Sequence, residues 1–151
     1  MNMVNLALNV TGDIASIEML RDLMPDIENI LASPNPHMRK KSALVAVRAV
    51  RKFSEEEDIH NILSALPSYF DTRSSAVHVA GSSLLSSIYQ VPYVQMNTLI
   101  QLQDYLLPII VSILYDHTTD GTSSKPTDVY GKPFLIAKLI SSLRLMFSVT
   151  L

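Results

Sequence analysis

Apolar positions along the chain recur with the period of an α-helix. In residues 16–31, the apolar side chains follow the i, i+3, i+7 spacing that gathers them on one face of a helix, although Pro25 predicts a kink or a restart there. Comparable patterns are expected to form helices over 2–15, 35–53, 54–70, 76–91 and 96–115, and again from Pro133 onward. The pattern therefore predicts an all-α chain.

The clearest helix is expected over residues 35–53, where Asn35 can cap the first turn and Pro36 can occupy the first helical position. Projected at about 100° per residue, one arc is apolar and a neighbouring arc about 120° wide is cationic. The apolar arc holds Ala43, Ala46, Val47 and Val50. The cationic arc, interrupted by Leu44, holds Lys40, Lys41, Arg48, Arg51 and Lys52. Arg39 projects into the apolar arc, so it is expected to snorkel or to cap a helix.

A short motif repeats along the chain. Leu-Met-Pro at 23–25, Ala-Leu-Pro at 65–67 and Leu-Leu-Pro at 106–108 are separated by 42 and 41 residues, and each lies in an apolar helical stretch. A period near 40 residues is typical of HEAT and armadillo helix pairs. The fold expected is therefore an α-solenoid of HEAT/armadillo-like pairs, occupying residues 1–151 as a single unit. In such a core, aspartate at Leu44 or Val47 should unfold the repeat by burying an unpaired charge.

The polar stretch 116–132 is expected to be a loop inserted between the two helices of the third pair. Its glycines lack the spacing of a phosphate-binding loop, and its aspartates lack the alternating ligands of a calcium loop. The first expected helix has an apolar face but no preceding helix to cover it, and residues 145–151 do not form a polar cap at the other end. Because solenoids need polar caps, we expect a fragment of a longer solenoid or a chain whose ends dock on partners.

The composition of the chain argues against several classes of function. The chain is 48% hydrophobic with a formal charge of −2, which argues against intrinsic disorder and against general nucleic-acid binding. It has no cysteine, which excludes thiolate metal sites, and its first twenty residues lack the pattern of a signal peptide. The apolar run 99–114 contains Gln101, Gln103 and Asp104, so a soluble intracellular chain is expected rather than a membrane span.

No residue pattern predicts catalysis, a metal site or a cofactor. The four histidines are scattered without ligand spacing, and Ser54 followed by Glu57 has the spacing of a capping box. The cationic arc is the candidate site. It would bind an anionic partner, either an acidic segment of another subunit or acidic lipid. The alternative is a solvated face that pairs with acids of an adjacent repeat such as Glu55–Asp58.

Four segments carry a resemblance to a known family. Residues 35–52, Asn-Pro-His-Met-Arg-Lys-Lys-Ser-Ala-Leu-Val-Ala-Val-Arg-Ala-Val-Arg-Lys, resemble the trunk of the gamma-adaptins, large subunits of the type-one clathrin adaptor complex. Residues 6–16 and 18–31 resemble the preceding segment, and 133–145, Pro-Phe-Leu-Ile-Ala-Lys-Leu-Ile-Ser-Ser-Leu-Arg-Leu, a later helix. The tract 74–81 departs from the family pattern, and the extreme N-terminal trunk, hinge and ear have no counterpart.

The resemblance implies a non-enzymatic trunk segment without a cofactor. Its expected partners are a second large, a medium and a small adaptor subunit, with an Arf-family GTPase and acidic phosphoinositide membrane. Its expected location is cytoplasmic, at trans-Golgi and endosomal membranes and coated vesicles. Two alternatives stay open: another helical-repeat scaffold of the transport-receptor or phosphatase-scaffold type, and an enzyme whose site is assembled from distant residues.

Overall fold

The computed structural model describes residues 2–119 and 132–150, and every element within these two ranges is a helix. The α-helices are joined by two short 3₁₀ helices, η1 and η2, in the middle of the chain. In chain order the elements are α1 (Asn2–Ile14), α2 (Ile17–Leu31), α3 (Pro36–Lys52), η1 (Glu56–Ile59), α4 (His60–Ala65), η2 (Leu66–Tyr69), α5 (Ser75–Gln90), α6 (Met96–Thr119) and α7 (Lys132–Thr150). The all-α prediction is confirmed.

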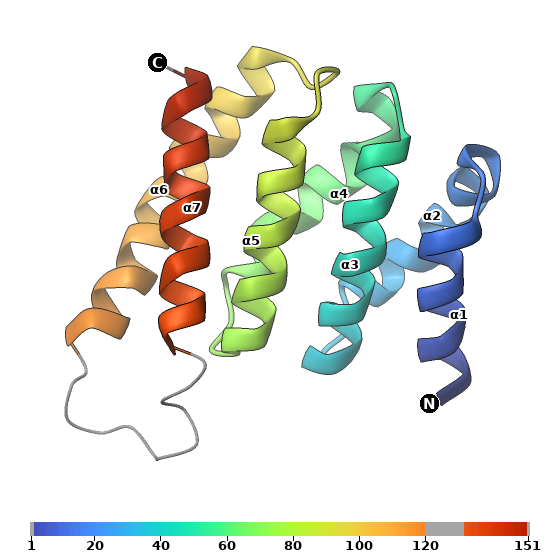
Figure 1. Cartoon of the computed structure of the whole chain (residues 1–151), viewed down its shortest axis with the longest axis horizontal. Coiled ribbons are helices and arrows are strands. Elements are labelled where there is room, and N and C mark those ends of the chain that lie inside the picture. Colours follow the sequence, from blue (N-terminus) through green and yellow to red (C-terminus); the bar gives the residue numbers. More distant parts are fainter. Residues whose placement is uncertain (1, 120–131, 151) are drawn as a thin grey trace.

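The helices form two layers (Figure 1). Helices α1, α3, α5 and α7 stand side by side in front, while α2, α4 and α6 cross behind them. In the front layer α3 packs against both α1 and α5, and α5 packs against α7; α2 packs on α3, and α6 on α7. Three successive pairs, α2/α3, α4/α5 and α6/α7, therefore stack along one direction. This arrangement confirms the expected α-solenoid.

The prolines of the repeated motif fall at corresponding places in the three pairs. Pro25 lies in α2, Pro67 in η2 and Pro108 in α6, so each belongs to the rear member of its pair. A proline inside a helix removes one backbone donor and crowds the preceding turn. The chain nevertheless continues as one helix through Pro25, so of the kink or restart expected there the restart is excluded.

Local chemistry explains where several helices begin. The Asn35 side chain accepts a hydrogen bond from the backbone N–H of His37, and Pro36 occupies the first turn, as the sequence predicts. Ser16 and Ser74 cap α2 and α5 in the same way. These caps satisfy donors that the helical ladder leaves unpaired.

The core is a continuous apolar cluster between the two layers. Each fully buried Leu or Ile contributes about 1.5–3 kcal/mol relative to an exposed one. The largest buried side chains of the core are Tyr69, Leu20, Leu31, Ile59, Ile62, Leu66, Leu84, Leu85, Ile88, Leu106, Ile110 and Leu135. Gly81 allows α5 and η2 to approach closely, because a Cβ added there would lie 2.8 Å from the Cβ of Tyr69.

The structure corrects three expectations about local structure. The segment 54–70 is broken into η1, α4 and η2, and its N-cap residue Glu55 makes no side-chain cap bond, so the capping box was wrong. Leu44 is 45% exposed, so its expected place in the core was also wrong. Helix α6 continues to Thr119 and α7 begins at Lys132, which shortens the expected loop; the rest of that loop lies outside the described residues.

Candidate functional site: a cationic helix layer

The cationic arc of α3 divides into two stripes. At about 100° per residue, Lys40 and Arg51 project in nearly the same direction, while Lys41, Arg48 and Lys52 project about 80–120° away. The first stripe lies on the side that faces α5 and α7, since Arg51 lines a hollow with residues of both helices. The second faces α1. The sequence alone did not separate these two directions.

The second stripe joins α3 to α1. The Arg48 guanidinium lies 2.9 Å from the Asp13 carboxylate and donates to the carbonyl of Asn9, and the Lys52 ammonium donates to the carbonyl of Ala15 at 2.9 Å. Both contacts satisfy groups near the C-terminus of α1, where the helix dipole favours cations. Arg48 and Lys52 therefore support the fold, whatever else they contact.

Lys40, Lys41 and Arg51 differ from these two cations. Within residues 2–119 and 132–150, none of the three makes an ion pair or a side-chain hydrogen bond. Lys40 and Arg51 are exposed, and Lys41 is half-buried. Of the five candidates, these three remain able to meet an anionic partner.

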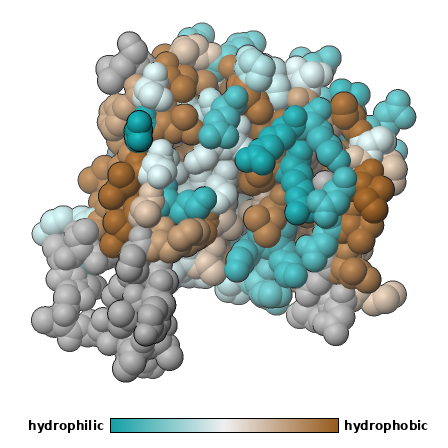
Figure 2. All heavy atoms as spheres, viewed as in Figure 1, coloured by the Kyte–Doolittle hydropathy of each residue, from teal (hydrophilic) through white to brown (hydrophobic). Residues whose placement is uncertain are grey.

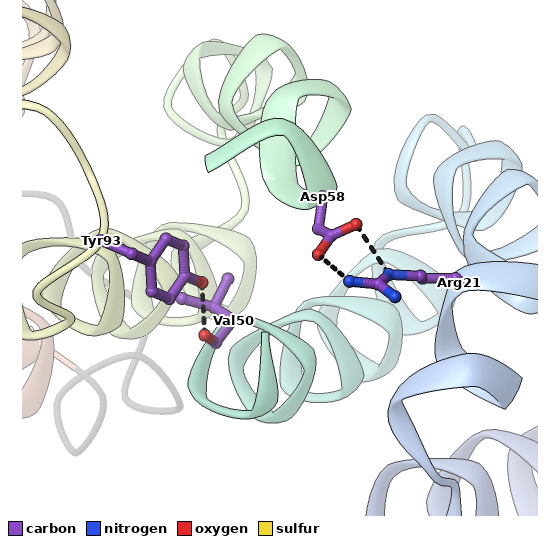
Figure 3. Close-up of polar contacts among 4 residues, drawn as sticks. All are labelled: Arg21, Val50, Asp58 and Tyr93. Carbon is purple, nitrogen blue, oxygen red and sulfur yellow. Dashed lines mark hydrogen bonds and ion pairs between the residues drawn. The ribbon is translucent and has the colours of Figure 1, made fainter. Parts of the chain in front are cut away.

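Two of the four acids in Glu55–Asp58, Glu56 and Asp58, have partners outside the cationic arc; Figure 3 shows the contact of Asp58. Asp58 receives two hydrogen bonds from Arg21, at 2.9 and 2.8 Å, which link η1 to α2. The Glu56 carboxylate accepts from the backbone N–H of Gln95 and from the Thr98 hydroxyl, both at 2.6 Å, and so caps the start of α6. The pairing that the sequence suggested, between these acids and the cationic arc, is absent for Asp58 and Glu56, and Asp13 supplies the partner instead.

Arg39 is half-buried and makes structural contacts, in line with the snorkelling or capping role expected from its place in the apolar arc. Its Nε donates to the carbonyl of Leu31 at 3.2 Å, and its Nη2 donates to the carbonyl and hydroxyl oxygens of Ser68 at 2.8 and 3.0 Å. The guanidinium carbon lies 4.7 Å from the centroid of the Tyr69 ring. Arg39 thus caps the C-terminal end of α2 and holds it against η2 and α3.

Charges separate between the two layers. Helices α3 and α7 carry nine of the twelve Lys and Arg residues of the chain, six and three respectively, and neither they nor α5 contain Asp or Glu. The rear elements α2, η1 and α6 carry nine of the fourteen acids, with Arg21 as their sole Lys or Arg. Figure 2 shows hydrophilic atoms gathered over α3 and paler ones over α5 on the front face. We call α3, α5 and α7 the cationic layer.

Tyrosine hydroxyls provide a second set of links between helices. Tyr93 donates to the carbonyl of Val50 at 2.5 Å (Figure 3), and Tyr89 donates to the carbonyl of Leu99 at 2.7 Å. Burial raises the pKa of each tyrosine to about 12, with Asp58 adding to the effect at Tyr93 and Asp104 at Tyr89. These hydroxyls remain protonated donors at neutral pH and have a structural role.

No metal-binding cluster occurs in the part of the chain that the structure describes, since no three His, Asp or Glu side chains converge there. His78 is buried against Phe70, and its Nε2 lies 2.6 Å from the carbonyl of Thr72.

By length and composition alone, residues Met96–Asp116 of α6 are apolar enough to cross a membrane. One face of α6, with Leu102, Leu106 and Ile110, is buried against the stack, while Ile100, Tyr105, Val111 and Tyr115 of the same helix are exposed.

Comparison with known proteins agrees with this architecture. Residues 1–150 match the family described as the adaptin N-terminal region. The chain is 30% identical over 145 residues to AP-1 complex subunit gamma of Dictyostelium discoideum, and the match covers 95% of this chain and 15% of that protein. It is 31% identical over 145 residues to AP-1 complex subunit gamma-2 of Arabidopsis thaliana, covering 95% of this chain and 16% of that protein.

The mouse AP-1 complex subunit gamma-like 2 is 28% identical over 142 residues, which cover 93% of this chain and 17% of that protein. The chain therefore spans about one sixth of the length of these relatives. No solved structure matches it. The resemblance noted in the sequence is confirmed, and the chain belongs to the adaptin family through its N-terminal region.

Proposed function

We propose that this chain is a non-enzymatic scaffold segment of a clathrin adaptor large subunit that acts in vesicle-mediated intracellular protein transport. The observation that carries the proposal is the match of residues 1–150 to the adaptin N-terminal region, together with an uninterrupted stack of helix pairs. A stack of this kind presents long continuous faces and holds partners in fixed register. In this role the chain acts by binding other proteins through the surfaces of its helices.

The proposed partners are the other subunits of such a complex, namely a second large, a medium and a small subunit. In this proposal residues 1–151 form one stretch of the large subunit's trunk, and the polar residues that connect α6 to α7 are an insertion between the two helices of the third pair. Lys40, Lys41 and Arg51 of the cationic layer meet an acidic surface, while Arg48 and Lys52 keep α3 fixed against α1. An Arf-family GTPase and phosphoinositide lipid would bring the complex to trans-Golgi and endosomal membranes from the cytoplasm.

Co-expression tests this function. The chain would be produced with the medium, small and second large subunits of a type-one adaptor, and purified through a tag on the small subunit. We expect the chain to elute with the other subunits as one species in size-exclusion chromatography. A matched sample would contain the chain carrying Val45→Asp, which places a charge in the core and should abolish co-elution. Failure of the unchanged, folded chain to co-elute would overturn the proposal.

A further inference from the structure

A cation-lined groove follows the contact between α5 and α7. One hollow of about 420 Å³ is lined by α3, α5 and α7, and a second of about 270 Å³ adjoins it along α5 and α7. Ser86, Gln90 and Ser141 line both hollows, so the two form one elongated groove. No acidic side chain lines either hollow.

Three cations surround the groove. Arg51 and Lys138 line the first hollow, and Arg144 lines the second. Among the residues that the structure places, these three make no ion pair, although the Lys138 ammonium lies 5.7 Å from the centroid of the Phe134 ring. Because the helices that supply them contain no acid, no side chain of the cationic layer neutralises these cations. An anionic ligand would supply the missing opposite charge.

The shape of the groove favours an extended peptide over a lipid surface. Lys138 and Arg144 are six residues apart on α7, which corresponds to about 9 Å along the helix axis. A chain in the extended polyproline II conformation advances about 3.1 Å per residue with three residues per turn, so acidic side chains three residues apart lie on one face, about 9 Å apart, and would match the two cations. The hydroxyl and amide groups of Ser86, Gln90 and Ser141 can bond the peptide backbone between them. A flat bilayer would not enter a hollow between two helices.

We propose that this groove binds an acidic, extended segment of a partner protein, with Arg51, Lys138 and Arg144 as its charge-recognising residues. The site is distinct from the Lys40 and Lys41 end of α3. The inference goes beyond the scaffold role, since it requires only the folded chain and no assembled adaptor complex.

A peptide-binding experiment with the full chain tests the groove. The probe is a short fluorescein-labelled Gly/Ser peptide with Glu at every third position, measured by fluorescence anisotropy at low ionic strength. A second peptide carries Gln at the same positions. We expect saturable binding of the Glu peptide and at least tenfold weaker binding of the Gln peptide, because the cations then lose their charged partners. Added salt should weaken the Glu peptide's binding.

Two double charge-reversal variants distinguish peptide binding in the groove from attraction to the net charge of the protein. Lys138→Glu with Arg144→Glu should weaken peptide binding about tenfold or more, whereas Lys40→Glu with Lys41→Glu changes net charge equally and should weaken it about twofold or less. Ser141→Trp would fill the groove without changing the charge and should also weaken binding. This neutral variant keeps the test valid if the Lys138/Arg144 pair of reversals lowers thermal stability.

Several results would overturn the proposal. Equal losses in the two pairs of reversals would show attraction to net charge alone. Unchanged binding by Ser141→Trp would place the peptide outside the groove. Binding of phosphatidylserine vesicles in the absence of any Glu-peptide binding would assign the cations to a membrane, and no binding of either probe would reject the site. None of these measurements depends on co-elution with adaptor subunits. The groove proposal can therefore fail while the scaffold function holds.

Discussion

Arg39 should contribute more to stability than any of the five cations that surround it on α3. It donates to the carbonyl of Leu31 and to two oxygens of Ser68, and its guanidinium lies over the Tyr69 ring. Replacing Arg39 with Ala removes all of these contacts at once. It also leaves the carbonyl at the C-terminal end of α2 without this donor, in a region where water has restricted access.

The contacts set the size of the effect. A hydrogen bond from a charged donor contributes about 1.5–3 kcal/mol, and less when its partners are partly exposed, and a cation–π contact adds about 0.5–1 kcal/mol. Since the two Ser68 contacts involve one nitrogen and are exposed, we expect Arg39→Ala to lower the free energy of unfolding by about 3 kcal/mol. For a chain of this length that corresponds to a fall in Tm of about 6–12 °C.

Urea and thermal unfolding followed by far-UV circular dichroism measure this directly. Lys40→Ala is the matched control, because Lys40 is the next residue on α3, is exposed and has no partner among the described residues; it should change stability by less than about 0.5 kcal/mol. Arg39→Lys keeps the charge but loses the planar fork, so it should retain less than half of the contribution. A loss below about 0.5 kcal/mol for Arg39→Ala would refute the role assigned to this residue.

Three further predictions concern packing and pH. Gly81→Ala should destabilise by about 1–2 kcal/mol despite the better helix propensity of alanine, because its Cβ meets a neighbouring Cβ at 2.8 Å; a Tm equal to or above that of the unchanged chain would contradict this. Val45→Asp should abolish cooperative unfolding, while Leu44→Asp, at a position 45% exposed, should leave it nearly intact; the reverse order would show that α3 is rotated from its described position. The folded-state pKa of about 12 for Tyr89 and Tyr93 exceeds the unfolded value near 10, so their contribution to stability is complete below about pH 10 and is lost as pH rises through about 12. Ultraviolet titration showing both phenols ionising near pH 10 in folded protein would contradict it.

Periodicity and capping chemistry predicted much of the fold, because both depend on neighbours in sequence. Asn35 and Pro36 mark the start of α3 correctly, and the recurrence of the proline motif at about 40 residues identifies the three stacked pairs. The break of 54–70 into three short helices was missed. Glu56 explains part of it, since its carboxylate is recruited by the start of α6, about 40 residues later in the chain.

The candidate site was only partly accessible from sequence. A helical projection gives the directions of Arg48 and Arg51 but not which neighbouring helix occupies each direction. The contribution of α7, through Lys138 and Arg144, requires knowing that α7 lies beside α5. One signal was present, the complete absence of acids from three of the helices, but it acquires meaning only when those helices are seen to form one layer.

We propose the cationic layer as the face on which this adaptin-family chain meets its partners. Amide hydrogen exchange, measured on the chain alone and after co-purification with the other adaptor subunits, tests it most directly. Contact through the cationic layer should concentrate the added protection in α3, α5 and α7. Protection confined to α2, η1 and α6, with α3, α5 and α7 exchanging as in the free chain, would contradict it.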